Sequence, residues 1–495
     1  MIKKFLTNWK FYLVFLVILC AGVFLRLFKA EYLFQYTHDN DLAGWVIRDI
    51  VGNYHLRLIG QETSTTGVFI GALYYYLQIP FYMLTKMDPI GAVLLGALTG
   101  LLGMISTYFV FKRVFNQETA LVGMLIYGIS FYVVLVEKEI VPTALVFVWT
   151  VWILYALHLI LNGENKKGLV LSGILGGLIW HINFALIIPF SLVLVALVIT
   201  SQKTKLGDYF IGALTFVLAN GPLVVFELRH GFSQTKSIVN SLTQNQNDII
   251  GGWEKVQRVI YLLSKDATSL VFGGAMNFKF EYVLLAIALL FVYLLAKRVI
   301  TKKIGLIFSL WVILYILFFS SYSKIVSEYY LNGAIIVFIA ILSVGIAELV
   351  KSKKAHLLGV VCVSLFCTFN YHKLINFQIN RSGYFDKKET IRDIDSNRGL
   401  HNYPCISVSY ITDPGYDRGY RYFIWHRGLK TKPITGDVPV YTIVFPLKPV
   451  FKVDRTSGAI GVIYPEFKKY EGKDLTKECE GEDFNSVDSM IGLTI

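Results

Sequence analysis

Charged side chains are scarce in this chain of 495 residues. Asp, Glu, Lys and Arg make up 16% of it, against about 25% in a typical soluble domain. Cysteine occurs only 5 times, and no pair of Cys or His residues has the spacing of a zinc site. The chain shows no short repeat, no low-complexity tract and no small-residue cleavage site after its first apolar segment. These absences argue against a soluble multidomain protein, a structural metal and a cleaved leader.

Long apolar runs take the place of the missing charge. Hydrophobic residues make up 55% of the sequence, and stretches of roughly 17–25 residues, each long enough to cross a bilayer, fill the first three quarters. We predict a mainly α, polytopic membrane protein with about 11 transmembrane helices. The expected spans are 11–28, 89–111, 119–136, 143–161, 168–181, 183–200, 208–227, 280–296, 304–321, 328–349 and 356–371.

The net charge of +13 is concentrated in clusters of Lys and Arg that fall in short gaps between apolar runs. Two expected spans separate each cluster from the next, as the positive-inside rule requires if all clusters face the cytoplasm. We therefore expect a plasma-membrane protein with a cytoplasmic amino terminus and a functional site on the outer side. We do not expect a nucleic-acid binder. The clusters are Lys3, Lys4 and Lys10; Lys112 and Arg113; Lys166 and Lys167; Lys203 and Lys205; Lys297, Arg298, Lys302 and Lys303; and Lys351, Lys353 and Lys354.

The composition changes near residue 372. Residues 1–371 are expected to form the transmembrane domain, with outer-loop helices at about 40–85 and 228–279. Residues 372–495 lose the long apolar runs and are expected to form a small extracytoplasmic α/β domain. Its strand-like stretches are "CISVSYIT", "YRYFIW" and "VYTIVF", with a turn signal at Asp413-Pro414-Gly415. Cys405 and Cys479 fall here, but sequence does not fix their distance, so their pairing stays open.

The first outer segment carries an acidic cluster, "HDND" at 38–41. Leu42, Trp45, Val46 and Ile50 follow it at helical spacing. This pattern predicts a helix along the membrane surface, capped by Asp39 or Asn40. Asp39 and Asp41 have two readings. They are first-turn acids favoured by the helix dipole, or one of them is a base that takes the proton of an attacking hydroxyl.

The following stretch, "GQETSTTGVFIGALYYYLQIPFYMLT" at 60–85, is interrupted by Pro80. A full span here would invert every later basic cluster, so we expect an interfacial or re-entrant segment with its Tyr side chains at headgroup level.

Other polar groups fall at the outer ends of expected spans. Glu137 and Glu139 form an acidic turn. It is either a solvent-exposed loop, or it brings a second carboxylate to the same cavity as the first outer segment. Arg229 and His230 suit phosphate oxygens, or anchor the chain to lipid headgroups. His181, in a tight outer turn, is either a packing residue or a substrate contact. Arg48, Lys324 and Tyr329 complete the candidate binding residues.

These motifs together resemble the C-type-fold membrane glycosyltransferases, in particular the protein-mannosyltransferase and aminoarabinose-transferase-like group of family 39. The likeness rests on the acidic motif after the first span, on "GVFIGALYYYLQIPF" and the acidic turn, on "GPLVVFELRHGF", and on "SYITDPGYDRGYRYFIW" in the tail. The chain departs from the family in carrying His-Asp-Asn-Asp where members often carry Asp-Glu, and it has no Trp-Trp-Asp motif.

The resemblance implies transfer of a sugar from a polyprenyl-phosphate carrier to an acceptor (a lipid, a glycan or a protein) on the outer face, with inversion and without a nucleotide. By position, Asp39 matches the family's base, with Asp41 as the alternative. Glu139, or else Glu137, matches the second-loop acid, and Arg229 and His230 match the phosphate-side basic group. No cofactor is expected, although two acid clusters leave a divalent ion open.

Two other functions remain alternatives at this stage. A lipid or polysaccharide transporter is expected to show internal repeats and charges at mid-membrane depth, and neither is visible here. An oligosaccharide ligase or polymerase of related architecture is expected to have a groove much larger than one sugar ring.

Overall fold

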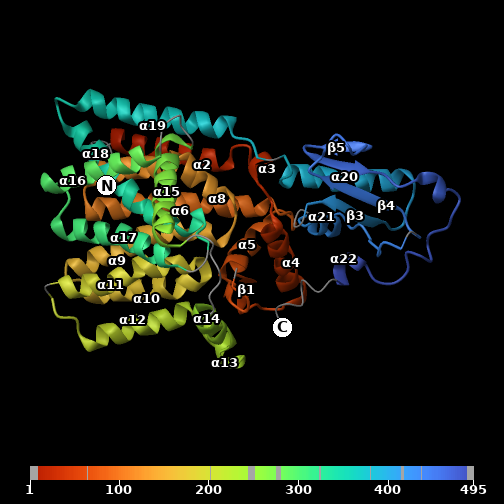
Figure 1. Ribbon diagram of the computed structural model, residues 1–495, viewed down its shortest axis with the longest axis horizontal. Coiled ribbons are helices and arrows are strands. Elements are labelled where there is room, and N and C mark those ends of the chain that lie inside the picture. The colour runs from red at the N-terminus through yellow and green to blue at the C-terminus, as the bar shows by residue number, and fades with distance from the viewer. Residues whose placement is uncertain are drawn as a thin grey trace.

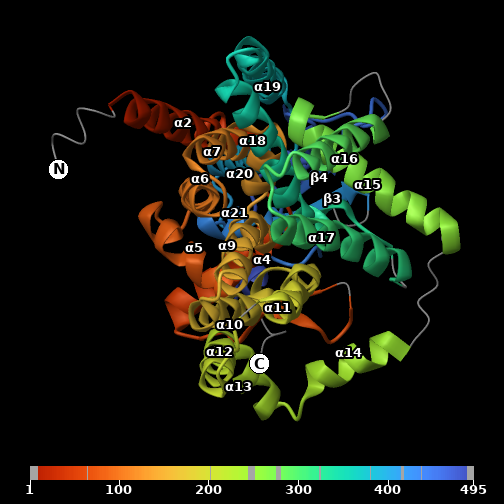
Figure 2. The same ribbon diagram turned by 90° about the vertical axis from the view of Figure 1, so that its left-hand side faces the viewer.

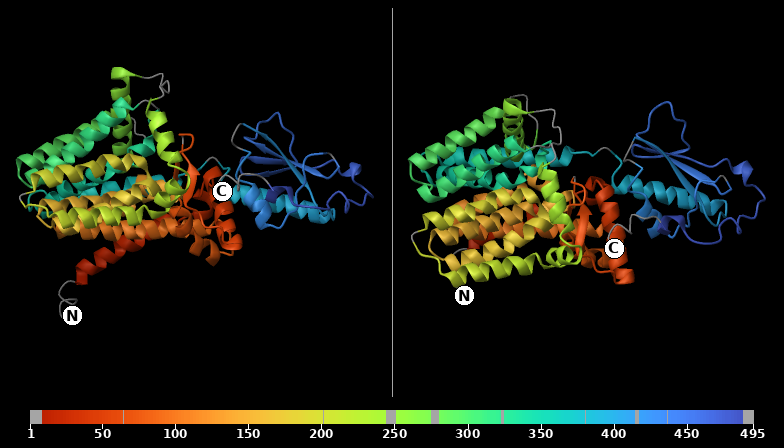
Figure 3. Two further views of the ribbon diagram at one scale, coloured as in Figure 1. Left: turned by 90° about the horizontal axis from the view of Figure 1, so that it is seen from below. Right: turned by 60° about the horizontal axis from the view of Figure 1, so that its bottom comes forward.

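The computed structural model describes residues 9–63, 65–200, 202–243, 251–274, 280–322, 325–379, 381–413, 417–435 and 437–487. The molecule is elongated, with a bundle of long helices at one end and a small α/β domain at the other (Figure 1). A layer built from α4 (His38–Asn53), β1 (Ile59–Glu62) and α5 (Leu73–Leu84) lies between them. Figure 3 shows the same three-part arrangement from two further directions.

Each expected span coincides with one helix or with two or three consecutive helical segments. The bundle comprises α2 (Trp9–Leu27), α6 (Gly91–Val114), α7 (Gln117–Ile129), α8 (Phe131–Lys138), η1 (Pro142–Leu145), α9 (Val146–Leu161), α10 (Asn165–Ile182), η2 (Phe184–Leu186), α11 (Ile187–Ile199), α12 (Leu206–Ala219), α13 (Gly221–Arg229), α16 (Glu281–Ala296), α17 (Lys302–Ser321), η3 (Glu328–Tyr330), η4 (Asn332–Ala334), α18 (Ile335–Lys351) and α19 (His356–Asn376).

Among the described residues, 5 helical segments are long and apolar enough to cross a membrane, and 7 are if each bent pair counts as one span. The pairs α7–α8 and α12–α13 bend by 53° and 72°. α2, α11 and α16 are apolar but shorter, so the figure of eleven spans stays a prediction.

Several basic clusters lie at the bundle end far from the α/β domain. Lys351 pairs with Glu118 at 3.5 Å, which joins the end of α18 to the start of α7. The Nζ atom of Lys303 donates to the carbonyl of Leu161 at 3.2 Å, which brings the start of α17 to the end of α9. Asn165 beside Lys166 contacts the carbonyl of Gln202. These cations therefore share one end of the bundle. This is expected if two spans separate each basic cluster from the next.

The helix predicted after the acidic cluster at 38–41 is present as α4. Its surroundings differ from the membrane surface that the sequence analysis expects. It begins after Thr37, whose N–H donates to the side chain of Asn40 at 2.8 Å, so Asp39 is not its cap. Trp45, Val46 and Ile50 are buried in a cluster shared with α5 and the carboxyl-terminal domain. Protein, and not lipid, covers its apolar stripe.

The segment at 60–85 forms a β-hairpin and a short helix. β1 pairs antiparallel with β2 (Phe69–Gly71), Ile59 standing opposite Gly71, and α5 follows with Pro80 inside it. Tyr74, Tyr75 and Tyr82 are buried, so protein covers these side chains, and their expected depth at headgroup level stays a prediction. The remaining helices outside the expected spans are α3 (Ala30–Leu33), α14 (Ser233–Thr243) and α15 (Gly252–Phe272), and Figure 2 shows α14 apart from the bundle.

The carboxyl-terminal domain holds a four-stranded mixed sheet in the order β3-β4-β6-β5. β3 runs parallel to β4, with Ser407 opposite Val440, and the other neighbours are antiparallel. α20 packs against β5 and β6. The elements are α20 (Tyr384–Leu400), β3 (Ser407–Thr412), α21 (Arg421–His426), β4 (Val440–Phe445), β5 (Arg455–Ser457), β6 (Ile460–Ile463), η5 (Phe467–Lys469) and α22 (Phe484–Val487).

Two of the three strand predictions match β3 and β4. "YRYFIW" instead forms α21, because Tyr422 and Phe423 are buried in the cluster shared with α4, and tertiary packing overrides the strand preference of aromatic residues. Of the turn signal, Pro414 and Gly415 lie outside the described residues.

Cys405 and Cys479 form a disulfide with a Cα–Cα distance of 5.6 Å, which settles a pairing that the sequence left open. Both residues lie in a small apolar cluster with Tyr403, Val438 and Tyr470. The bridge joins residues 74 positions apart, and Cys405 directly precedes Ile406 of the main sheet core.

Replacing both Cys405 and Cys479 by Ala is expected to destabilise the carboxyl-terminal domain by roughly 2–4 kcal/mol, because the unfolded loop regains its freedom. Thermal unfolding and limited proteolysis of the purified protein measure the effect. Cys362→Ala, which removes a free thiol, is the control. Equal proteolytic resistance of the double variant and wild type would contradict the structural role of the bridge.

Candidate active site

A cavity of about 1200 Å³ lies where the ends of the bundle helices meet the layer that contains α4 and β1. Its polar wall contains carboxyl, hydroxyl and amide groups, and its other wall is apolar and comes mainly from α10, α11, α12 and α17. Polar lining residues include Asp39, Gln61, Glu62, Thr63, Thr65, Glu139, Thr143, Asn183, Tyr322, Tyr329 and Tyr330. Apolar lining residues include Ile179, Trp180, Ile182, Ile187, Phe190, Phe216, Leu314, Leu317, Phe318 and Phe319.

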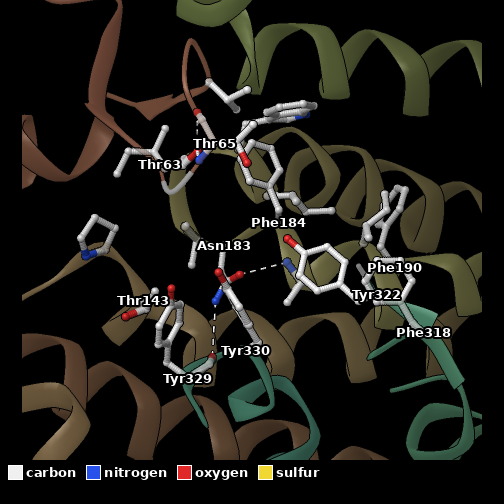
Figure 4. A pocket seen from close by; sticks show the side chains of 18 of the residues that line it. Thr63, Thr65, Thr143, Asn183, Phe184, Phe190, Phe318, Tyr322, Tyr329 and Tyr330 are labelled. Carbon is white, nitrogen blue, oxygen red and sulfur yellow. Dashed lines mark hydrogen bonds between the residues drawn. The ribbon is translucent and has the colours of Figure 1, made fainter. Parts of the chain in front are cut away.

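Figure 4 shows how the two sides of the cavity are separated. Thr143, Asn183 and Tyr329 lie together, whereas Phe190 and Phe318 lie toward the opposite side. Asn183 accepts from the N–H of Ala185 at 2.9 Å and donates to the carbonyl of Tyr329 at 3.5 Å. This amide therefore ties η2 to η3, and it holds two parts of the wall in register.

One hydrogen bond joins the two acidic turns that the sequence singled out. The Nδ2 atom of Asn40 donates to the carbonyl of Ile140 at 2.9 Å, between residues 100 positions apart. Asp39 precedes the donor and Glu139 precedes the acceptor, and both line the cavity. The expected meeting of two carboxylates over one cavity is thus present.

The turn that carries Glu139 is fixed by its two preceding residues. Glu137 is fully buried and pairs with Arg26 of α2 at 2.5 Å, and it also accepts from the hydroxyl of Tyr127 at 2.8 Å. Lys138 donates to the carbonyl of Phe28 at 2.6 Å. Glu137 is therefore a structural partner of α2, and it does not reach the cavity.

The Arg26–Glu137 pair depends on a close approach of two helices. A Cβ atom at Gly100 would lie 1.6 Å from Nε of Arg26, so α6 carries glycine where the guanidinium crosses it. After the pair, Ile140 adopts a φ of 53°, which is costly for a β-branched residue. Strain of this kind persists where the surrounding contacts fix the backbone. Here the left-handed conformation of Ile140 changes the direction of the chain directly after Glu139.

Burial and the nearby charge of Glu328 raise the pKa of Glu139 to about 7. At neutral pH this carboxyl therefore exists in both protonation states. It can accept hydrogen bonds from hydroxyl groups when ionised and donate one when protonated.

Asp41 faces away from the cavity, because residues two apart on a helix point to nearly opposite sides. It is buried and accepts from the N–H of Tyr422 at 3.2 Å and the hydroxyl of Tyr36 at 3.3 Å. Burial raises the pKa of Asp41 to about 6. Arg48, on the same helix, stacks over Trp45 and Trp425 at 5.2 and 4.8 Å. Both residues join α4 to the carboxyl-terminal domain, so neither is placed to act on a substrate in the cavity.

The remaining sequence candidates are dispersed. His181 is 3% exposed and packs against Gly71 of the hairpin, where a Cβ would lie 1.9 Å from its Nδ1 atom. Arg229 and His230 are exposed at the end of α13 and are not among the residues that line the cavity. Tyr329 does line it. Lys324 lies outside the described residues.

Comparison with known proteins connects this geometry to a fold. Residues 71–225 match the model of the dolichyl-phosphate-mannose-protein mannosyltransferase family. The chain is also similar to the crystal structure of ArnT from Cupriavidus metallidurans bound to undecaprenyl phosphate, with 12% identity over 90% of this chain and 97% of that one, and a TM-score of 0.59. The chain has the C-type membrane glycosyltransferase fold. The apo state of the same ArnT matches with the same identity and coverage and a TM-score of 0.58.

The resemblance found in the sequence is therefore confirmed at the level of the fold, and the protein is a multi-pass membrane protein. No curated protein matches the chain. The matched segment contains the turn with Glu139 and ends before Arg229, and it does not include Asp39.

Within this C-type fold, α15 supplies cations that the sequence reasoning passed over. Lys255, Arg258 and Lys265 occupy one face of the helix, as their spacing of three and seven residues dictates. Two of them contact the segment before η3: Lys255 donates to the carbonyl of Tyr322, and the guanidinium of Arg258 lies 3.4 Å from the carbonyl of Val326. Lys265 pairs with Glu328, the first residue of η3, at 2.5 Å.

These contacts place the cations directly behind a wall of the cavity, since Tyr322 and Tyr329 line it on either side of that segment. No Lys, Arg or His occurs among the described lining residues themselves. The basic face of the amphipathic helix was readable at 255–265, but its position beside the cavity was not.

The environment of Asp41 predicts a pH-dependent stability. Its folded-state pKa is above the value of an unfolded Asp, so its ionised form costs roughly 2–3 kcal/mol above pH about 6, and this cost disappears as the pH falls toward 4. Asp41→Asn keeps an acceptor for Tyr36 and Tyr422 without the charge. The variant is expected to unfold at a higher temperature than wild type at pH 7.5, and at nearly the same temperature at pH 4.5. A lower unfolding temperature of the variant at pH 7.5 would refute this account of the carboxyl.

Proposed function

We propose that the protein transfers a sugar from a polyprenyl-phosphate carrier to an acceptor on the outer face of the membrane, with inversion at the anomeric carbon and without a nucleotide. The observation that carries the proposal is the composition of the cavity. Carboxylates from two outer turns stand on one side of it, and apolar residues from membrane helices form the other.

The apolar wall suits the lipid part of such a donor. Its residues come from α10, α11, α12 and α17, helices whose outer faces are themselves apolar. A prenyl chain lying against Phe190, Phe216 and Phe318 would leave the bilayer without exposing its carbons to water. The volume of about 1200 Å³ exceeds the roughly 300–1000 Å³ of ordinary small-molecule pockets, which fits a sugar together with the first part of a long chain.

Asp39 is the proposed base. Its carboxylate takes the proton of the acceptor hydroxyl as that oxygen attacks the anomeric carbon, while the bond from that carbon to the carrier phosphate breaks. Attack from the side opposite to the phosphate inverts the configuration. Glu139, on the adjoining turn, is proposed to hold hydroxyl groups of the sugar or of the acceptor. No metal ion takes part in this scheme.

The departing phosphate needs positive charge, because its oxygens carry the electrons of the broken bond. Arg258 is the proposed source, with Lys265 beside it. The guanidinium contact of Arg258 with the carbonyl of Val326 is long, at 3.4 Å, and Lys265 is half-buried in a pair with Glu328. Both groups can turn to a phosphate at modest cost, and Arg offers two parallel donors to it.

Two features of the chain support the proposed topology of the reaction. The basic clusters lie at the bundle end opposite the α/β domain, which the positive-inside rule assigns to the cytoplasm. The Cys405–Cys479 disulfide in the α/β domain belongs in an oxidising compartment. Both support a plasma-membrane enzyme whose cavity opens on the outside.

Asp39→Asn is expected to lower the rate of sugar release from the lipid carrier by at least 100-fold, because the variant offers no base to the attacking oxygen. The measurement uses purified protein in lipid vesicles with a panel of radiolabelled undecaprenyl-phosphate sugars, in buffer containing EDTA. Asp208→Asn, at the start of α12 and the other end of the bundle, is the control. Normal turnover by Asp39→Asn would remove Asp39 as the base, and inactivity of the wild type in EDTA that Mg²⁺ or Mn²⁺ restores would refute a metal-free reaction.

Arg258→Ala is expected to raise the KM for the lipid donor or lower kcat by 10–100-fold, about 1.4–2.8 kcal/mol. Arg229→Ala is the matched comparison, because it removes a guanidinium from an exposed helix end outside the cavity lining. Donor titrations in the same vesicle assay measure both. A larger defect in Arg229→Ala than in Arg258→Ala would contradict the role of Arg258. It would instead indicate that the carrier phosphate binds at the end of α13.

A further inference from the structure

A second cavity, of about 530 Å³, lies between α4 and the carboxyl-terminal domain. The first turn of α4 separates it from the larger one. Asp39 lines the larger cavity and Asp41 lines the smaller, and the two acids point to nearly opposite sides of the same helix. The smaller cavity is thus a close neighbour of the proposed base.

Its wall carries an excess of positive charge. Arg418, Arg421 and Lys432 line it together with two acids, Asp41 and Asp417. The charge of Asp41 is partly offset, because it interacts favourably with both Lys387 and Arg421 and accepts two hydrogen bonds. Asp417, at the exposed rim, is the acid that opposes the cations there.

The cations are held by contacts that leave them at the cavity wall. Arg421 donates to the side-chain oxygen and the carbonyl of Asn485 at 3.1 and 2.8 Å. Lys432 donates to backbone carbonyls of Glu480 and Glu482. Arg418 is exposed and its Nη1 atom lies 3.0 Å from Nε2 of His38, the residue that precedes Asp39. Arg418 therefore bridges the rim of this cavity and the acidic turn.

The rest of the lining suits a saccharide. Tyr410 brings a hydroxyl group, and Ile434 and the ring of Phe484 are exposed at the wall. The hydroxyl of Thr431 donates to Asp483, and the amide of Asn485 bonds to Arg421, so these two groups shape the wall. A hydroxyl group matches sugar hydroxyls, and an exposed ring offers a face to the C–H side of a sugar. With three cations added, the chemistry fits a sugar that carries a negative charge.

We propose that this second cavity binds an anionic saccharide portion of the acceptor, bearing a phosphate or a carboxylate, and so holds the acceptor beside Asp39. As an acceptor site it rests on the proposed function. The binding itself does not, since it needs neither the lipid donor nor turnover.

The test is equilibrium binding to the full-length protein in detergent, followed by ligand-observed NMR, with glucose 1-phosphate, glucuronate and glucose as separate probes. One or both anions are expected to bind and glucose to bind at least tenfold more weakly. Binding of glucose 1-phosphate alone identifies a phosphate site, and binding of glucuronate alone identifies a carboxylate site. Failure of both anions to bind, or equal binding of glucose, overturns the proposal.

Two variants of opposite sign localise the binding. Arg418→Ala is expected to weaken anion binding about tenfold, and Asp417→Ala to strengthen it about threefold, because one removes a cation and the other the opposing acid at the same rim. Lys448→Ala, an exposed lysine of the same domain outside the lining, is expected to change nothing. Equal effects of Arg418→Ala and Lys448→Ala, or weakening by both rim variants, overturns the assignment.

The two proposals fail separately. Loss of anion binding leaves donor cleavage by wild type and its dependence on Asp39 untouched. Normal donor cleavage by Asp39→Asn leaves the anion titrations as they are.

Discussion

The hydrogen bond from Asn40 to the carbonyl of Ile140 is the contact on which the candidate site depends. It fixes the turn with Asp39 to the turn with Glu139, although the chain passes through the hairpin, α5, α6 and α7 between them. A buried amide donor and a buried carbonyl must find partners, and here each finds the other. The two carboxyl groups are thereby brought to one cavity by neighbours that carry no charge themselves.

The ends of this contact are anchored in different ways. On one side, Arg26 and Glu137 form an ion pair that is nearly inaccessible to solvent, with further bonds from Arg26 to the carbonyls of Gly22 and Gly128. A buried pair of this kind adds little net stability, but breaking it is costly, so it fixes the position of α8 against α2. On the other side, Asn40 sits in the first turn of α4, which the carboxyl-terminal domain covers.

That coverage gives the α/β domain a structural role in the site. Tyr422 of α21 donates its N–H to Asp41 and its hydroxyl to the carbonyl of Met87, and Tyr384 of α20 donates to Asp88 at 2.6 Å. These bonds tie the domain to α4 and to the start of α6 at once. The acidic turn is therefore held from the bundle side and from the domain side, with a cavity on each face.

The sequence by itself determined the class of the molecule and the chemistry of its outer turns. Apolar runs of bilayer length, basic clusters in alternate gaps and an acidic turn before a helical stripe are local patterns, and burial in lipid or a helical period acts on each of them directly. Asp39, Glu139 and Tyr329 could be chosen on that basis. The tertiary structure alone decided that Asp41, Glu137 and His181 are packing partners, that "YRYFIW" is helical, and that Arg258 of α15 contacts the segment behind a wall of the cavity. The physical reason is that a charge pattern states which groups need partners, whereas their partners come from segments hundreds of residues away and are set by how the helices pack.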